Sequence, residues 1–131
     1  MSTAFRMTFV AQPEDIDVMG HVNNAVWVRW MEIVATHHWE ALAPMDVQQR
    51  VAWVVTRHEI DYRGNVRQGE TVEAVTQIDG PPRGARFDRV TEFFGTDGKL
   101  RVTARTTWAM IDLASGRLMR VPADLAEIFL A

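Results

Sequence analysis

The segment 23–42, NNAVWVRWMEIVATHHWEAL, constrains the fold more than any other part of the sequence. Its apolar side chains fall on nearly every side of a helix, a pattern typical of a helix that is buried on most of its circumference. Pro44 ends the segment, because proline cannot continue a helix. Such a helix needs more than one sheet face to cover it, so we expect a sheet that curls about it.

Segments that alternate between apolar and polar residues surround the helix and predict strands. A short apolar stretch at 4–11 precedes the helix, and alternation follows it along 51–62, 71–78, 85–95 and 99–112. The tight turn TDG joins the last two segments as a hairpin. One strand, one buried helix and four further strands in antiparallel succession predict an α+β fold.

The alternation also predicts which side chains face the core. In segment 51–62 the predicted inward face consists of Ala52, Val54, Thr56, His58, Ile60 and Tyr62. On the last two long strands the opposite face carries Arg86, Asp88, Arg101 and Arg105, which predicts a solvated face. The tail 120–131 has a proline near its start and predicts a short terminal helix.

Length and composition restrict the class of protein. The chain has 131 residues, and we expect 1–131 to form a single domain. Its formal net charge of −3 argues against a nucleic-acid or anionic-membrane partner, because such proteins usually carry a basic face. Without cysteine, disulfides, thiolate nucleophiles and cysteine-based zinc sites are excluded. The sequence shows neither a signal-peptide pattern nor an apolar run that could span a membrane, so we expect a cytoplasmic protein without membrane insertion.

The stretch DIDVMGHVNN, residues 15–24, places two carboxylates, a glycine, a histidine and two asparagines directly before the long helix. Asp, Gly and Asn are common turn and helix-start residues. One interpretation is therefore that the stretch does no more than begin the helix. It also brings an acidic side chain close to the first amides of a helix, which have no intrahelical partners and lie at the positive end of the helix dipole. That combination can activate a nucleophile and stabilise an oxyanion.

This stretch and the order of elements resemble the hotdog fold and, within it, the 4-hydroxybenzoyl-CoA thioesterase family. The resemblance rests on Asp15, Asp17, Gly20, His21, Val22, Asn23 and Asn24, on Trp27 where relatives usually have tyrosine, and on Glu32. The segments IDYRGNVRQGE (60–70) and VPADL (121–125) match as well, so the resemblance covers essentially the whole chain. It implies a hotdog thioesterase domain with a curled antiparallel sheet of about five strands wrapped around one long buried helix. HVNN also resembles plant acyl-carrier-protein thioesterases, which implies an acyl thioester without choosing its carrier.

The resemblance further implies roles for residues of the turn. Asp17 matches the family's catalytic aspartate, described as nucleophile or general base, and Asn24 matches the backbone donor to the oxyanion. Gly20 has no side chain and so permits the substrate carbonyl to approach the backbone. His21 matches a histidine thought to orient the thioester or assist proton transfer in the plant-type enzymes. Those enzymes carry an asparagine where this chain has Met19.

Four residues at the start of the helix have both a structural and a functional interpretation. We interpret Asn23 as a helix cap first and a substrate contact second. Trp27, Trp30 and Met31 are mostly core residues and are also candidates for lining an acyl pocket.

The remaining acidic and histidine residues of interest favour structural interpretations. Glu32 lies where some hotdog families place a catalytic carboxylate, but pairing with Arg29 or a hydrogen bond within an interface is the favoured alternative. His37 and His38 are adjacent, so their side chains diverge on a helix and cannot form a helical metal site. We therefore expect no metal. His58 is interpreted as a core histidine.

We therefore expect an acyl-CoA thioesterase that releases a carboxylic acid and CoA and needs no cofactor, since coenzyme A is part of the substrate. The alternatives are an acyl-carrier-protein thioesterase and a non-catalytic acyl-CoA-binding hotdog module. The arginines of the outer sheet face are suited to the phosphates of coenzyme A. Hotdog sheets pair edge to edge, which predicts a homodimer or homotetramer.

Overall fold

The computed structural model describes residues 4–130, which form a sheet and three α-helices. The strands are β1 (Phe5–Val10), β2 (Val51–Tyr62), β3 (Thr71–Ile78), β4 (Arg86–Phe94), β5 (Leu100–Asp112) and β6 (Arg117–Leu118). The helices are α1 (Asn24–Leu42), α2 (Met45–Arg50) and α3 (Ala123–Leu130), and a 3-10 turn, η1, spans Pro13–Asp15. No helix within this part of the chain is long and apolar enough to cross a lipid bilayer.

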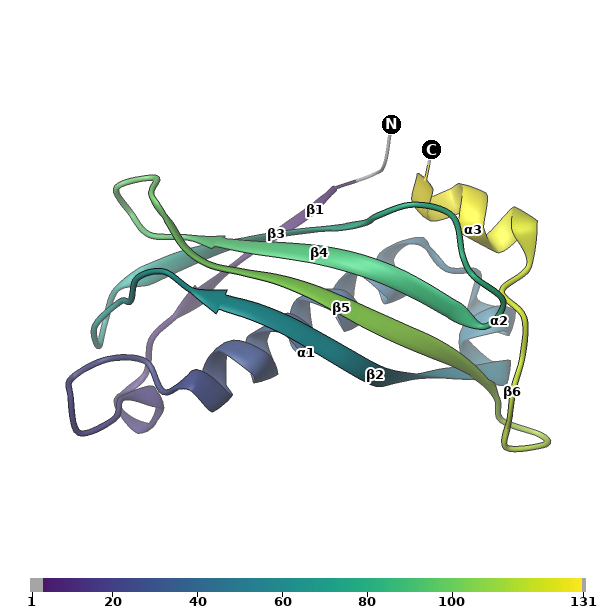
Figure 1. Cartoon of the computed structure of the whole chain (residues 1–131), viewed down its shortest axis with the longest axis horizontal. Coiled ribbons are helices and arrows are strands. Elements are labelled where there is room, and N and C mark those ends of the chain that lie inside the picture. Colours follow the sequence, from purple (N-terminus) through teal and green to yellow (C-terminus); the bar gives the residue numbers. More distant parts are fainter. Residues whose placement is uncertain (1–3, 131) are drawn as a thin grey trace.

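The strands form one antiparallel sheet in the order β1-β3-β4-β5-β2, with the two-residue β6 beside β5. Figure 1 shows this sheet as a curved layer across α1, with α2 and α3 at the end where α1 finishes. The predicted α+β arrangement, a curled antiparallel sheet against one long helix, is therefore confirmed. The predicted terminal helix is α3.

The sheet covers one side of α1 rather than most of its circumference, which corrects the sequence prediction. The buried side consists of Val26, Trp27, Trp30, Met31, Val34, Ala35 and His38. The exposed side carries Ala25, Arg29, Glu32, Thr36, His37 and Glu40. Most of these exposed residues are polar and recur at three- or four-residue spacing, so they lie on one stripe of the helix. In the single chain, this stripe faces solvent.

A bulge in β2 divides its inward face in two. The pairing register between β2 and β5 shifts between Val55 and Arg57. Before the shift, Val54 is 45% exposed and Trp53 packs against the core, so the predicted inward face is wrong there. After it, His58 and Ile60 lie on the inner side as predicted, whereas Tyr62 is exposed. One extra residue reverses the alternation of a strand, and periodicity alone does not reveal it.

The core consists of two clusters, one on each half of α1. The first lies at the N-terminal half, where the Trp27 ring contacts the edges of Trp30 and Phe93 at centroid distances of 5.2 Å each. The second lies at the C-terminal half, where Trp39 stacks on Phe129 at 5.7 Å. The residues of α3 pack only into this second cluster.

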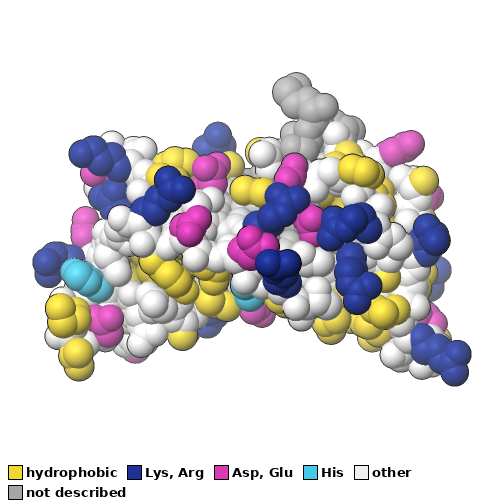
Figure 2. Space-filling model, viewed as in Figure 1, with side chains coloured by type: hydrophobic (Ala, Val, Ile, Leu, Met, Phe, Trp, Pro, Cys, Tyr) yellow, Lys and Arg dark blue, Asp and Glu magenta, His cyan; other side chains and the backbone are white. Residues whose placement is uncertain are grey.

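The outer face of the sheet carries intermixed basic and acidic side chains (Figure 2). Asp88 departs furthest from the predicted solvated face, because only 5% of it is exposed. Its carboxylate accepts hydrogen bonds from Arg83 at 2.7 and 3.1 Å, from Arg105 at 3.1 Å and from Thr107 at 2.8 Å. The hydrogen bond from Arg83 is the largest cause that lowers the Asp88 pKa to about 2. This network ties β4 to β5 and to the loop before β4.

Candidate active site

The turn from Asp17 to Gly20 is fixed by backbone hydrogen bonds. The Gly20 N–H donates to Asp17 O at 3.0 Å, and the Asp17 N–H donates to His21 O at 2.8 Å. Gly20 has a φ of +78°, in the left-handed region that favours glycine, and a Cβ there would lie 3.2 Å from Arg67 Nη1. The position therefore requires glycine for its backbone conformation.

Asp17 uses one carboxylate oxygen for the turn and keeps the other free. Its Oδ1 accepts hydrogen bonds from the Met19 N–H at 2.9 Å and the His21 N–H at 3.2 Å. Its Oδ2 has no partner among residues 4–130, and the residue is half-buried. The arrangement orients a carboxylate and leaves an oxygen available to a substrate or a water.

The first turn of α1 begins shortly after the Ile16–Val22 bridge that closes this turn. Asn23 caps the helix, as predicted, because its Oδ1 accepts a hydrogen bond from the Ala25 N–H at 2.9 Å. The Asn24 N–H belongs to the first helical residue and has no intrahelical acceptor. Asn24 is exposed, and its backbone oxygen accepts a 3.4 Å hydrogen bond from the Tyr62 hydroxyl at the end of β2. A free donor at the positive end of the helix dipole therefore lies at the surface near the turn.

Asp15 has a purely structural environment. It is 3% exposed, and its carboxylate accepts hydrogen bonds from Arg29 Nη2 at 2.8 Å and from the Gln12 N–H at 2.9 Å. Its backbone oxygen also accepts the Asn23 N–H at 2.9 Å. This residue holds the turn against α1. Since Arg29 is used here, the predicted alternative of a pair between Arg29 and Glu32 is wrong.

Glu32 lies near the partly buried His58 of β2 instead. The Glu32 Oε2 and His58 Nε2 atoms are 3.8 Å apart, and half of the Glu32 side chain is exposed. The other ring nitrogen of His58 is 2.8 Å from the Thr106 hydroxyl oxygen. No group of three or more potential metal-ligating side chains occurs among the residues that the structure describes.

An open groove of about 550 Å³ lies beside the turn. It is lined by His21, Tyr62, Arg63, Gly64, Asn65, Arg67, Glu70 and Arg101. Arg101 is held by Asp97 and by the backbone oxygen of Asn65, at 3.1 and 2.9 Å. Arg63 and Arg67 are exposed at the surface. The turn residue His21 is therefore next to a cationic groove suited to anionic groups.

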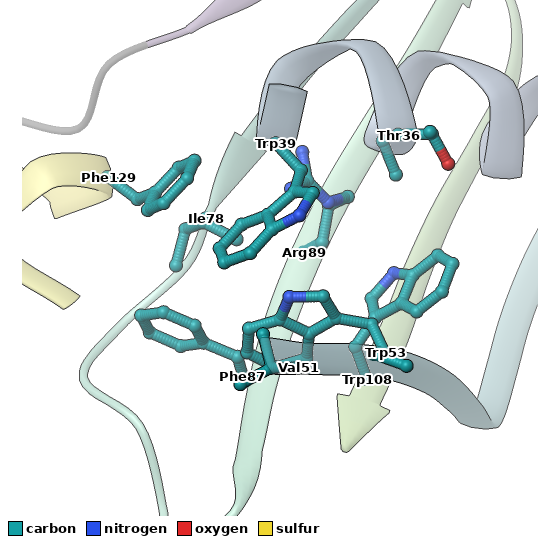
Figure 3. A pocket seen from close by; sticks show the side chains of 11 residues that line it. Thr36, Trp39, Val51, Trp53, Ile78, Phe87, Arg89, Trp108 and Phe129 are labelled. Carbon is teal, nitrogen blue, oxygen red and sulfur yellow. The ribbon is translucent and has the colours of Figure 1, made fainter. Parts of the chain in front are cut away.

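A second, mostly apolar cavity of about 220 Å³ lies at the other half of α1 (Figure 3). It is lined by Ala35, Thr36, Trp39, Val51, Ala52, Trp53, Ile78, Phe87, Arg89, Trp108 and Phe129. Trp27, Trp30 and Met31, the predicted pocket residues, lie in the first core cluster and do not line it. A pocket role for these three stays a prediction. Trp53 of β2 and Trp108 of β5 line this cavity, and they are the residues from which the sequence could have indicated it.

A buried arginine and a buried histidine meet at this cavity. Arg89 Nη1 donates to His38 Nδ1 at 2.9 Å and to the Thr76 hydroxyl at 3.0 Å. His38 is fully buried, between Phe5 and Phe129. Burial, and then the charge of Arg89, lower the His38 pKa to about 4, so the ring is neutral at pH 7.

Because His38 is buried and neutral, we expect the protein to be less stable in mild acid. The ordinary histidine pKa is 6.5. As the pH falls from 6.5 towards 4, His38 therefore binds a proton in the unfolded chain but stays neutral in the native protein. The free energy of unfolding has its full value above pH 6.5 and should fall by about 3 kcal/mol across this pH range. Urea unfolding at a series of pH values measures the loss. The variant His38→Asn keeps an acceptor for Arg89 and should flatten the curve, whereas equal slopes in both proteins would contradict the assignment.

Comparison with solved structures shows which fold this is. A predicted thioesterase from Bacillus stearothermophilus superposes with a TM-score of 0.83 at 19% identity, over 98% of each chain. A DHNA-CoA thioesterase from Staphylococcus aureus gives 0.79 at 21% identity, over 89% of this chain and 80% of that chain. An acyl-ACP thioesterase from Bacteroides thetaiotaomicron gives 0.82 at 22% identity, over 98% of this chain and 54% of that chain. The predicted hotdog fold is therefore confirmed.

Comparison of the sequence identifies the family. No curated protein matches the chain. The narrower resemblance to 4-hydroxybenzoyl-CoA thioesterases stays a prediction. The match to the thioesterase-like superfamily extends over residues 11–129, and the chain therefore belongs to that superfamily.

Proposed function

We propose that the protein hydrolyses an acyl-CoA thioester to a carboxylic acid and CoA. The observation that carries this proposal is the free Oδ2 of Asp17 on a fixed turn, which is closed by the Ile16–Val22 bridge shortly before the unpaired Asn24 N–H of α1. A carboxylate and an oxyanion donor are the two groups that thioester hydrolysis requires. Membership of the thioesterase-like superfamily supports the same reaction class.

The reaction follows from these two groups. The carbonyl oxygen accepts the Asn24 N–H, and the helix dipole stabilises the negative charge that develops on it. Asp17 either attacks the carbonyl carbon or takes a proton from an attacking water. The carbon–sulfur bond then breaks, and the sulfur leaves with the electron pair and gains a proton as CoA. In the first route, water then hydrolyses the mixed anhydride between Asp17 and the acyl group, which releases the acid and restores the carboxylate. In the second route, the attacking water itself supplies the new oxygen of the acid. His21 lines the groove and would orient the carrier.

Coenzyme A is the proposed carrier because of the groove beside the turn. Its 3′-phosphate and pyrophosphate are anionic, and Arg63 and Arg67 are exposed there. An acyl-carrier protein is the alternative, since one of the similar structures is an acyl-ACP thioesterase. Assaying both carriers with the same acyl group separates them. A screen of acyl-CoA substrates with release of free thiol as the readout tests the proposed reaction itself.

No cofactor enters this reaction, so exhaustive chelation should leave the rate unchanged. The carboxylate and the backbone amide supply the charge stabilisation that a metal would otherwise provide. The rate with and without EDTA measures this. Loss of activity on chelation, restored by zinc, would contradict the carboxylate mechanism.

The open edge of β2 supports a homo-oligomer. This strand is the last in the sheet, has twelve residues, and no strand of residues 4–130 pairs with its outer edge. Antiparallel pairing of β2 with β2 of a second copy would cover it. Within one chain, Tyr62 at one end of β2 contacts Asn24, and Val51 at the other end lines the cavity. Such pairing would therefore bring the Asp17 turn of one copy beside the cavity of the other.

Light scattering at micromolar concentration should accordingly give a mass of at least twice 14.9 kDa. A larger multiple would indicate further association of dimers. The β2 variant Val55→Pro removes a backbone N–H that faces the outer edge and should shift the protein towards the monomer with loss of activity. A monomer with full activity would exclude a site shared between copies.

A further inference from the structure

The cavity at the second half of α1 contains a buried positive charge. Arg89 lies on the inner side of β4 and is 5% exposed, in a lining that is otherwise mostly apolar and aromatic. Burial lowers its pKa to about 10, so the guanidinium stays charged at pH 7. A buried charge without a counter-charge is costly and is seldom found in a folded protein.

No carboxylate of residues 4–130 forms a salt bridge with Arg89. Its two hydrogen-bond partners, His38 and Thr76, are both neutral. Because an arginine can only donate, His38 Nδ1 must be the acceptor, and the proton of the ring lies on Nε2. Neither partner therefore compensates the charge.

Three nitrogen donors of the cavity lining also lack partners. Arg89 Nε, Trp53 Nε1 and Trp108 Nε1 are all buried and make no hydrogen bond. Buried donors normally have acceptors, and the cost of leaving them unpaired adds to that of the charge. The residues of the lining thus combine one cation with several donors that have no acceptor in the chain, and an anionic oxygen ligand beside Arg89 would supply a counter-charge.

The size of the cavity limits that ligand. A cavity of roughly 150 Å³ is known to hold benzene, and this one measures about 220 Å³. The cavity itself has room for a short chain or a single ring with a carboxyl group. Of the anionic oxygen groups, a carboxylate matches the guanidinium in shape and charge and can accept two of its N–H groups.

We propose that this cavity binds the distal end of the acyl group and that this end carries a carboxylate, held by Arg89. The preferred substrates are thus thioesters of compact dicarboxylic acids. This inference rests on the proposed thioester hydrolysis. Along α1, Thr36 at the cavity lies about 18 Å from Asn24 of the same copy. A compact acyl group cannot span that distance. The thioester would therefore meet the Asp17 turn of a second copy, which β2 pairing would bring beside the cavity.

The kinetic test compares adipoyl-CoA with hexanoyl-CoA, which have the same chain length and differ in the terminal carboxylate. The wild-type protein should hydrolyse adipoyl-CoA with a kcat/KM at least about tenfold higher, from a charged hydrogen bond in a buried site. Arg89→Met, of similar volume, should abolish this preference. The matched control Ile78→Val changes only the apolar lining and should affect both thioesters by similar factors.

A binding test separates this inference from the proposed reaction. Hexanoate should raise the Tm of the wild type, whereas the neutral hexanamide should not, and Arg89→Met should respond to neither. If hexanoate binds in this way but no thioester is hydrolysed, the proposed reaction fails and the carboxylate site stands. Equal or faster hydrolysis of hexanoyl-CoA by the wild type would overturn the inference, even if Arg89→Met does not fold. A preference that survives in Arg89→Met would also overturn it.

Discussion

Replacing Asp17 by asparagine should lower kcat by a factor on the order of 10²–10⁴ and leave Tm nearly unchanged. Asparagine keeps an Oδ1 that can accept the Met19 and His21 N–H groups, which hold the turn at 2.9 and 3.2 Å. It removes the negative charge that either route of hydrolysis needs. If the carboxylate is a covalent nucleophile, the loss should be greater still.

Asp15→Asn is the matched control for this variant. Asp15 has the same chemistry two residues earlier, but its carboxylate is buried and paired with Arg29. Its replacement should lower Tm through the weakened Arg29 and Gln12 contacts, with kcat of the folded protein little changed. Substrate KM should move little in the Asp17 variant. Near-wild-type turnover with unchanged Tm would make Asp17 a turn residue and favour the non-catalytic binding module.

Replacing Trp27 by alanine should lower the free energy of unfolding by about 3–5 kcal/mol. This side chain is fully buried in the first core cluster, between Trp30 and Phe93, so truncation leaves a large cavity. Urea unfolding followed by circular dichroism measures the change.

Trp27→Phe is the corresponding control. It roughly conserves the shape of the core and also removes Nε1, a buried donor without a hydrogen bond, so it should cost less than about 1.5 kcal/mol. Neither variant should change the preference among acyl groups if Trp27 is purely a core residue. A changed acyl preference in Trp27→Phe, with stability preserved, would instead assign it to the substrate pocket.

The elements with a clear hydrophobic period were predictable from the sequence. The helix at 23–42 and the strands after it follow directly from that period, and the turn at 15–24 from its residue types. Asn23 as the cap also follows, because it acts on a backbone N–H only two residues away.

The features that the sequence did not predict depend on contacts between distant segments. The bulge in β2 is defined by its pairing with β5. The residues of β2 alone do not show that one of them is left unpaired. The burial of Asp88 depends on Arg83 and Arg105, which approach it only in the folded sheet. Arg89 follows Asp88 and therefore faces inward, but a charged residue in that position runs against the usual pattern. The cavity that surrounds it joins five elements and a terminal helix.

The division of the core along α1 has a consequence for how such a protein can change during evolution. The cluster that supports the Asp17 turn and the cluster beside Arg89 both pack on this helix but have no side chain in common. Substitutions at sites more than about 10 Å apart usually have additive effects on stability. Mutations that reshape one end should therefore be tolerated without compensating changes at the other, so descendants of one ancestor can diverge in substrate range and keep the same reaction.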